Sequence, residues 1–355
     1  MSEQQQDRAG IALGLDSFGD MTSQSDGSRT HSAQVIRDHV GHAVLADSFG
    51  IDAISFGEHH RRDFAISAPD MVLAGAATVT ERITLGTAVT VLSSDDPIRV
   101  MERFATLDAM ANGRAEITVG RGSFTESFPL FGYELNDYAL LFEEKFDMFA
   151  RLLDQPETFT WSGQHRKPVE GGIIMPRTET RLAAWVGVGG SPESVLRSVK
   201  QRIPMMLAII GGPAARFKPY ADLYRRAQSE TGVPRMPLGV HSPGHIAETD
   251  EKAHEELRDR WIANRNTIGR ERGWPPSTAD EFEHEAEHGS LYVGSPETVA
   301  KKIAQTVLAL DLDRFDLKYS NGPMQDEQLR RSIELYGTEV IPRVREIVGE
   351  ARQLN

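Results

Sequence analysis

Short apolar runs that alternate with helical patterns recur through this sequence and constrain its fold more than any other feature. Each run is too short to form a helix and is bounded by glycine, proline or polar residues. We expect eight strands, at Ile11–Asp16, Ala53–Phe56, Ile83–Leu92, Arg114–Val119, Ala184–Val188, Pro204–Ile210, Pro237–His241 and Arg314–Tyr319. Because a helical pattern separates consecutive runs, the strands should be parallel with right-handed crossovers. Eight such units predict an α/β fold, a closed (β/α)8 TIM barrel rather than an open doubly wound sheet.

The helices are predicted from apolar residues at helical spacing and from proline or glycine at their ends. We expect them at Ser32–Phe49, Pro69–Thr80, Pro97–Met110, Tyr138–Leu153, Pro192–Lys200, Pro213–Thr231, Asp250–Ile268, Pro296–Leu310 and Asp326–Val348. The length of 355 residues fits one barrel domain over 11–350, with insertions after strands four and seven. Residues 155–181 contain Pro, Gly and Trp without a clear period and are expected to be an insertion, and residues 1–10 a flexible N-terminus.

Composition excludes several classes of protein and of partner. The hydrophobic content of 39% and charged content of 26% are ordinary for a globular protein, and no apolar run is long enough to span a membrane. The first residues lack the pattern of a secretory signal, and the absence of cysteine fits a reducing cytoplasm. The formal net charge of -13 opposes binding to nucleic acid or to an anionic membrane. We therefore expect a cytoplasmic protein without either partner.

Two glycine-containing turns follow predicted strands four and five. The first, Gly120-Arg121-Gly122-Ser123, places a cation between residues that allow close approach of the backbone to a ligand. The second, Gly189-Gly190-Ser191, precedes Pro192 in the first turn of a helix, whose positive end should face the same ligand. An arginine contact to an anion contributes about 1.5–3 kcal/mol and a helix terminus about 0.3–1, so Arg121 should dominate. Neither turn has the spacing of a Rossmann or Walker motif.

The loops that follow barrel strands share one rim, where barrel enzymes carry their active sites. Mostly polar and small residues are expected there, namely Asp16, Phe18, Glu58, His59, His60, Arg121, Ser123, Gly189–Ser191, Gly211–Gly212, His241, His245 and Ser320–Gly322. Adjacent residues at the end of an extended strand point to opposite sides, so only one of His59 and His60 should lie in the site. An imidazole can donate or accept a proton near neutral pH, which makes this histidine a candidate for substrate chemistry.

A second motif, His284-Glu285-Ala286-Glu287-His288, matches the His-Glu-x-x-His pattern of zinc proteases. Two histidines four residues apart do share a helix face. However, Phe282 is the only large apolar residue nearby, Gly289 follows at once, and no third ligand is apparent. We interpret the segment as a solvated acidic helix and keep a zinc hydrolase as an alternative from another class.

With these residues laid out, the sequence resembles the bacterial luciferase-like family of flavin-dependent monooxygenases and oxidoreductases, from Gly14 to about Arg343. The matching pieces keep the family's order and spacing, and they are Ala46–Gly50, Glu58–His60, Arg82–Val89, Leu107–Arg114, Gly120–Gly122, Phe131–Gly132, Val186–Ser194, Gly294–Glu297 and Asn321–Gly322. The family implies a (β/α)8 barrel that binds reduced FMN at the carboxyl rim, or a deazaflavin coenzyme in one branch.

The resemblance also implies roles for individual residues. The FMN phosphate would contact Arg121 and the Gly189-Gly190-Ser191 turn, with Ser194 at the start of the following helix. The isoalloxazine would lie near Ala88-Val89, where the family often has a non-proline cis peptide, and His59 aligns with a histidine that acts beside the flavin. One departure is that Tyr138-Ala139 stands where the family commonly has an arginine, and Lys145 is a nearby substitute.

These expectations define one principal function and several alternatives. The principal one is an FMN-dependent monooxygenase that uses reduced FMN and O2 on a small organic substrate, with electrons from a separate flavin reductase or from NAD(P)H. The same barrel could instead perform deazaflavin-dependent hydride transfer, as a dehydrogenase, or bind flavin without catalysis. The family precedent also implies a homodimer or a higher homo-oligomer.

Overall fold

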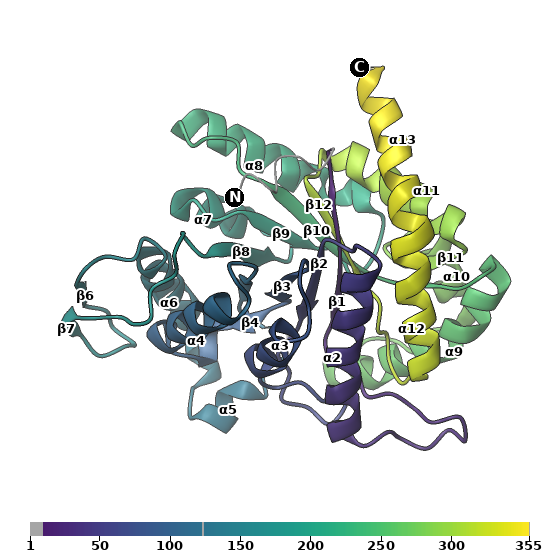
Figure 1. Cartoon of the computed structure of the whole chain (residues 1–355), viewed down its shortest axis with the longest axis horizontal. Helices are drawn as coiled ribbons and strands as arrows, with labels where there is room; N and C mark the ends of the chain where they lie inside the picture. Colours follow the sequence, from purple (N-terminus) through teal and green to yellow (C-terminus); the bar gives the residue numbers. More distant parts are fainter. Residues whose placement is uncertain (1–9, 123, 355) are drawn as a thin grey trace.

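The computed structural model describes residues 10–122 and 124–354. Its central sheet consists of short parallel strands, which Figure 1 shows at the centre of the molecule with helices around them. The strands are β1 (Ala12–Ser17), β2 (Ala53–Phe56), β3 (Thr84–Thr87), β4 (Thr90–Val91), β5 (Glu116–Gly120), β8 (Ala183–Val188), β9 (Met205–Ala208), β10 (Leu238–Ile246) and β12 (Arg314–Lys318). The flexible terminus expected at residues 1–10 lies, apart from Gly10, outside the described residues.

The order of the strands makes the sheet a barrel. Neighbours run β3-β2-β1-β12-β10-β9-β8-β5-β4, and every pair in this path is parallel. The ring closes because the Leu85 amide of β3 donates to the Arg114 carbonyl just before β5, at 2.9 Å. The predicted α/β barrel fold is therefore confirmed.

The helices cover the outside of the barrel. They are α2 (Ser32–Ser48), α3 (Pro69–Ala77), α4 (Pro97–Met110), α6 (Tyr138–Leu152), α7 (Pro192–Gln201), α8 (Lys218–Thr231), α9 (Asp250–Arg272), α11 (Pro296–Leu310), α12 (Asp326–Leu335) and α13 (Ile341–Gln353). Proline occupies the first helical position of α3, α4, α7 and α11, where its missing N–H costs no hydrogen bond. Within the described part of the chain, no helix combines the length and the apolar character that crossing a membrane requires.

Several predicted elements differ in detail from the structure. The expected third strand, 83–92, is divided into β3 and β4, and its end is a 3-10 turn at Leu92–Ser94. The aperiodic insertion at 155–181 contains an antiparallel pair, β6 (Phe159–Trp161) and β7 (Val169–Gly172), which lies at the left edge of the molecule in Figure 1. The expected helix 326–348 is two helices joined by a π-helical turn at Tyr336–Val340.

The insertion after β10 contains the acidic helix expected around His284–His288, and a strand that the sequence patterns did not resolve. Helix α10 (Ala279–Glu287) and strand β11 (Tyr292–Gly294) follow α9, and β11 extends the sheet by pairing with the end of β10. Helix α5 (Ser127–Phe131) lies in the connection after β5. These additions leave the order of the barrel strands unchanged.

The interior of the barrel is polar at its centre. The Arg314 guanidinium of β12 lies 2.6 Å from the Glu116 carboxylate of β5 and 2.8 Å from that of Asp316, and these three side chains are almost completely buried. Burial raises the pKa of Asp316 to about 6, while the Arg314 charge opposes that shift. Gly14 leaves the space for this group, since a Cβ there would lie 2.3 Å from Asp316 Oδ1. The buried group of Arg314, Glu116 and Asp316 is therefore stable only because its opposite charges compensate one another.

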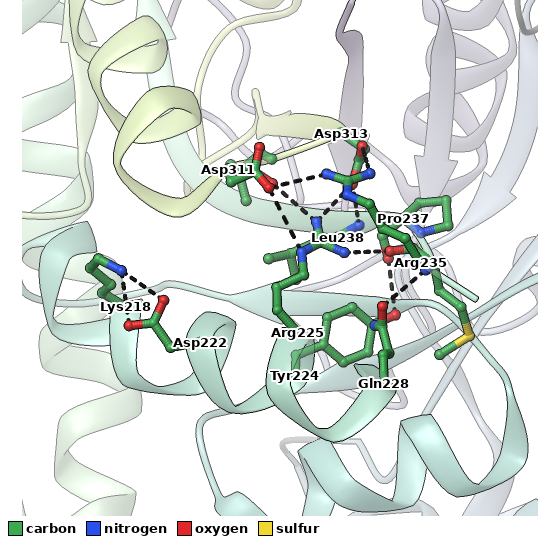
Figure 2. A network of polar contacts seen from close by, with 12 residues as sticks. Lys218, Asp222, Tyr224, Arg225, Gln228, Arg235, Pro237, Leu238, Asp311 and Asp313 are labelled. Atoms are coloured by element: carbon green, nitrogen blue, oxygen red, sulfur yellow. Dashed lines mark hydrogen bonds and ion pairs between the residues drawn. The ribbon is translucent and has the colours of Figure 1, made fainter. Parts of the chain in front are cut away.

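A second ionic network lies at the end of the barrel where the strands begin, which is the end opposite the carboxyl rim. Figure 2 shows Arg225 of α8 and Arg235 both directed at Asp311 and Asp313, just before β12. Asp313 also accepts a hydrogen bond from the Leu238 amide at 2.8 Å, which ties β10 to the start of β12. The ion pairs at this end thus stabilise the barrel. Barrel enzymes carry their active sites at the other rim, where the strands end.

The buried ion group generates a stability prediction. Replacing Arg314→Met leaves Glu116 and Asp316 without their cation and should lower the free energy of unfolding by about 3–5 kcal/mol, measured by urea denaturation at pH 7. The matched control is Arg226→Met, because the Arg226 side chain is 65% exposed and its ion pair with Glu230 is long, at 4.0 Å. Its effect should stay below about 0.5 kcal/mol. Equal effects of the two substitutions would contradict this interpretation of the barrel interior.

Candidate active site at the carboxyl rim

The two predicted anion-binding turns lie on neighbouring strands. Strands β5 and β8 pair in parallel with Val119 opposite Val186, so the turns 120–122 and 189–191 leave the sheet side by side. The Arg121 guanidinium lies 5.7 Å from the Tyr138 ring, and no carboxylate in residues 10–122 or 124–354 forms an ion pair with it. Arg121 therefore has its charge available for an anion. Ser123, the hydroxyl expected beside it, lies outside the described residues.

The second turn is built by the cap of α7. The Ser191 side chain accepts a hydrogen bond from the Ser194 amide at 3.3 Å and donates to the Ser194 hydroxyl at 2.9 Å. Gly190 has a φ of +99°, a conformation that favours glycine, and a Cβ added at Gly189 would meet no atom within 4 Å. The turn thus offers hydroxyls and open space at the positive end of a ten-residue helix.

Ala88 and Val89 join β3 to β4 beneath these turns, and the peptide bond between them is cis. The Val89 side chain packs where two neighbouring strands have glycine, since a Cβ on Gly120 would lie 2.7 Å from it and one on Gly187 3.2 Å. The Val89 carbonyl accepts a hydrogen bond from the Glu58 amide at 3.3 Å. The structure therefore places Ala88-Val89 between the turn of Arg121 and the residues that follow β2.

His59 projects into an aromatic environment at the rim. Its ring centroid lies 4.8 Å from Phe18, 4.4 Å from Phe64 and 5.1 Å from Phe124. Its Nε2 is buried and has no hydrogen-bond partner among the described residues, and burial lowers the pKa of His59 to about 3. His59 is consequently a neutral imidazole at neutral pH and can act there through hydrogen bonding.

Glu58 and His60, on either side of His59, face a different set of partners. The Glu58 carboxylate accepts from the Val91 amide at 2.8 Å and lies 2.9 Å from His60 Nε2. The His60 ring lies 5.0 Å from Phe131 of α5. The two side chains thus have different neighbours, with His59 among the rim aromatics and His60 beside Glu58. Both nevertheless border the same recess of the rim, where only one of the two was expected.

A small recess opens beside these residues. Its lining comes from the loop after β2, from β4, and from the connection after β5 with the start of α5. The lining residues are Glu58, His59, His60, Val91, Gly122, Phe124, Glu126 and Ser127. Arg61 closes one side, with ion pairs to Glu126 and to Glu271 of α9 and its guanidinium 4.5 Å above the Phe124 ring. The recess is therefore small, partly aromatic and covered by an ionic cluster.

The rim also contains a buried polar group that sequence patterns did not identify. Lys318 Nζ lies 2.9 Å from Asp20, and the Ser320 hydroxyl donates to the same carboxylate at 2.7 Å. The Ser17 hydroxyl continues this chain, 2.7 Å from Ser320 and 2.8 Å from His39 Nε2. Asp20 and Lys318 are 298 residues apart, and no spacing rule connects them.

Asp16 and His241, expected at the rim from the ends of their strands, meet there. His241 Nδ1 lies 2.5 Å from Asp16 Oδ2, and the His241 ring stacks on Phe18 with centroids 5.5 Å apart. Lys145, by contrast, is buried with its Nζ donating to the Ser93 carbonyl at 2.7 Å, and burial lowers the pKa of Lys145 to about 8. Its ammonium therefore already has a backbone partner.

The zinc alternative rests on His284 and His288 of α10 and its end. Their ring centroids lie 5.3 Å apart, and the His288 side chain is 59% exposed. Among the described residues, no group of three or more His, Asp or Glu side chains is arranged to hold a metal ion. Glu285 of the same motif instead accepts from the Gly212 amide. The motif has no third ligand in this part of the chain.

Comparison with known proteins gives a consistent result. Residues 17–311 match the family of luciferase-like monooxygenases. The 4-hydroxyprotoasukamycin monooxygenase of Streptomyces nodosus subsp. asukaensis is 30% identical over 245 residues, 66% of this chain and 65% of that protein.

Solved structures share the fold at lower identity. Monooxygenase RslO1 from Streptomyces bottropensis superposes with a TM-score of 0.81 at 21% identity, covering 94% of this chain and 99% of that one. The oxygenating constituent of 3,6-diketocamphane monooxygenase from Pseudomonas putida, in complex with FMN, gives 0.75 at 17% identity, with coverage of 94% and 99%. The coenzyme F420 dependent tetrahydromethanopterin reductase of Methanopyrus kandleri gives 0.70 at 18% identity, with coverage of 95% and 100%. By the match over most of its length, the chain belongs to the luciferase-like monooxygenase family.

Proposed function

We propose that this protein is a flavin-dependent monooxygenase that uses reduced FMN and O2 to oxygenate a small organic molecule. The observation that carries the proposal is the pairing of β5 with β8, which sets an arginine beside a serine-capped, glycine-lined helix start. No carboxylate of the described residues forms an ion pair with this arginine. This combination suits a phosphate monoester at the rim of a barrel. The family match supports the oxygenase chemistry.

The residues present fit the flavin in three respects. Arg121 would hold the phosphate, and Gly189, Gly190, Ser191 and Ser194 would surround it with backbone and hydroxyl groups. The isoalloxazine would lie near Ala88-Val89, next to the buried and unpartnered Nε2 of His59. When bound, reduced FMN supplies the electrons for O2 activation, which no side chain of the protein can supply.

The protein's own contribution would be orientation and exclusion of water. Neutral His59 would hydrogen-bond to the flavin or to oxygen, and the aromatic rings of Phe18, Phe64 and Phe124 around it would keep water away. The Arg61 cluster with Glu126 and Glu271 would close the recess over bound substrate.

A deazaflavin-dependent dehydrogenase is the second candidate, because solved structures of this fold include coenzyme F420 dependent enzymes. Both coenzymes carry a phosphate, so the same two turns would serve either one. A binding comparison of the two coenzymes distinguishes the candidates.

We further propose that reduced flavin comes from a separate reductase or from NAD(P)H, and that the protein works in the cytoplasm as a homodimer or higher homo-oligomer. Exposed apolar side chains on the neighbouring helices α2, α3 and α4 support a subunit interface. They are Val44, Met71 and Met110, with Val79 just after α3. Light scattering of the purified protein measures the oligomeric state directly.

The phosphate assignment predicts how FMN affinity responds to substitution. Arg121→Ala should raise the Kd for FMN about 10- to 100-fold, because a charge-assisted contact of about 1.5–3 kcal/mol is lost. Ser191→Ala should raise it less, about 2- to 5-fold, as loss of one neutral hydrogen bond implies. Fluorescence titration with FMN, and with the deazaflavin in parallel, measures both.

The matched control for Arg121 is Arg197→Ala on α7, whose guanidinium is already paired with Glu143 at 2.6 Å. Its Kd for FMN should equal that of the parent. Unchanged FMN affinity in Arg121→Ala would refute the phosphate assignment, and tighter binding of the deazaflavin by the parent would favour the dehydrogenase.

The burial of His59 predicts a pH dependence of stability. Its pKa is about 3 in the folded protein against 6.5 as the ordinary value, so the unfolded chain binds more protons between these limits. The free energy of unfolding should therefore fall as pH decreases from about 6.5 towards 4, and it should fall less in His59→Leu. Urea denaturation across this range measures the slope.

The exposed His288 provides the control for this slope, and His288→Leu should keep the parent's pH dependence. His39, whose pKa burial lowers to about 4, contributes in the same direction and stays in every variant. A His59→Leu slope equal to that of the parent would show that His59 is protonated as easily in the folded protein as in the unfolded chain.

A further inference from the structure

Two histidines flank the same aromatic ring at the centre of the rim. Phe18 lies 4.8 Å from the His59 centroid on one side and 5.5 Å from that of His241 on the other. Both histidines are buried, with less than a tenth of their surface exposed. Their hydrogen-bonding environments are nevertheless opposite, and this difference divides the work that the two imidazoles can do.

His59 is surrounded by rings and has no carboxylate partner, since its Nε2 is unsatisfied and its amide donates to the Ile66 carbonyl. An added proton there would lie in an apolar pocket, with Lys318 and Arg61 opposing it. Asp20 favours the proton from a distance, but it already pairs with Lys318. His59 is thus unsuited to carrying a proton between steps.

His241 has the arrangement that His59 lacks. Its Nδ1 lies 2.5 Å from Asp16 Oδ2, and Asp16 is completely buried. A carboxylate can only accept a hydrogen bond, so this contact fixes the proton on Nδ1 and directs the lone pair to Nε2. His241 Nε2 has no hydrogen-bond partner among the described residues, and Asp16 Oδ1 also lacks one.

The permanent cations of this region are already paired with other carboxyl groups. Arg314 forms ion pairs with Glu116 and Asp316 in the barrel interior, and Lys318 forms one with Asp20 at the rim. Asp16 is the remaining buried carboxyl group of this stack, and within the described residues the one side chain that its carboxylate contacts is His241. Asp16 therefore has an imidazole as its partner in place of a lysine or an arginine.

We propose that His241 and Asp16 form the proton-transfer pair of this site. His241 Nε2 gives a proton to oxygen and later recovers one, and Asp16 acts as a positioning residue that holds the tautomer and the ring. The inference rests on the proposed function, because it concerns the same flavin and O2.

The proton balance of the reaction is closed. Reduced FMN, O2 and substrate give oxidised FMN, oxygenated substrate and water, so one oxygen atom enters the substrate. The other leaves as water with the two hydrogens that reduced FMN loses. One of these passes through His241 as a proton, and the imidazole ends the cycle in the protonation state in which it began.

The test uses FMN and O2 alone, so it does not require the natural substrate. Without substrate, reduced FMN and O2 give oxidised FMN and hydrogen peroxide, a reaction that also moves protons onto oxygen. With the protein in excess over flavin, stopped-flow absorbance should show the last step of reoxidation slowed roughly tenfold or more in His241→Asn, at the low end of general acid–base effects. The pH dependence of that step should also flatten.

Asn at position 241 retains a donor towards Asp16 and removes Nε2, so the substitution targets proton transfer and spares the pair's shape. Asp16→Asn should slow the same step while shifting its pH profile, which a purely structural role would not do. The matched control is His254→Gln on α9, because His254 is not among the rim residues and its Nδ1 already lies 2.9 Å from Glu283. Its reoxidation kinetics should equal those of the parent.

Two measurements keep the outcomes separate. FMN titration of the parent tests the proposed function first, and a parent that binds no flavin overturns both proposals. A parent that binds and oxidises flavin, with His241→Asn unchanged in rate and pH profile, overturns only this inference.

Nitrogen NMR of the parent protein, with labelled histidine and no flavin added, provides a test that does not depend on whether the variants fold. It should show His241 with its proton on Nδ1 in the hydrogen bond to Asp16. A neutral His241 protonated only on Nε2 would overturn the pair.

Discussion

The parallel pairing of β5 with β8 is the constraint on which the geometry of the rim depends. It brings together a cationic turn and a helix start that are almost 70 residues apart, and glycines at 120 and 187 let Val89 pack between them. Each turn alone is an ordinary connection. Their adjacency, together with the absence of a carboxylate partner for Arg121 in the described chain, is the basis on which we propose an anion site there.

Buried charge connects the barrel centre to this rim. Arg314 compensates Glu116 and Asp316 at the centre, and Lys318, four residues further along β12, compensates Asp20. Alternate residues of one strand thus supply the cations of successive layers. Because these groups are nearly inaccessible to water, the electrostatics of the rim depend on the protein's own dipoles and charges more than on solvent.

Much of this architecture is predictable from sequence, and the limits are physical. The barrel can be predicted from the hydrophobic periodicity and from the glycine and proline residues that bound each element. The site strands β5 and β8 can be predicted from apolar runs that end in glycine. The division of the third strand at Ala88-Val89 was not predicted from hydropathy, because no polar residue interrupts the run between Thr87 and Thr90. The Asp20–Lys318 pair could not be predicted because only the closed ring brings residues 298 positions apart into contact.

Arg61 joins three parts of the rim that the chain makes separately. It comes from the loop after β2, and it binds Glu126 from the loop after β5 and Glu271 from the end of α9. Both carboxylates are partly open to solvent, so mobile ions compete with the guanidinium for them. Higher ionic strength therefore weakens the contacts by which this one guanidinium holds two loops and the end of α9 together.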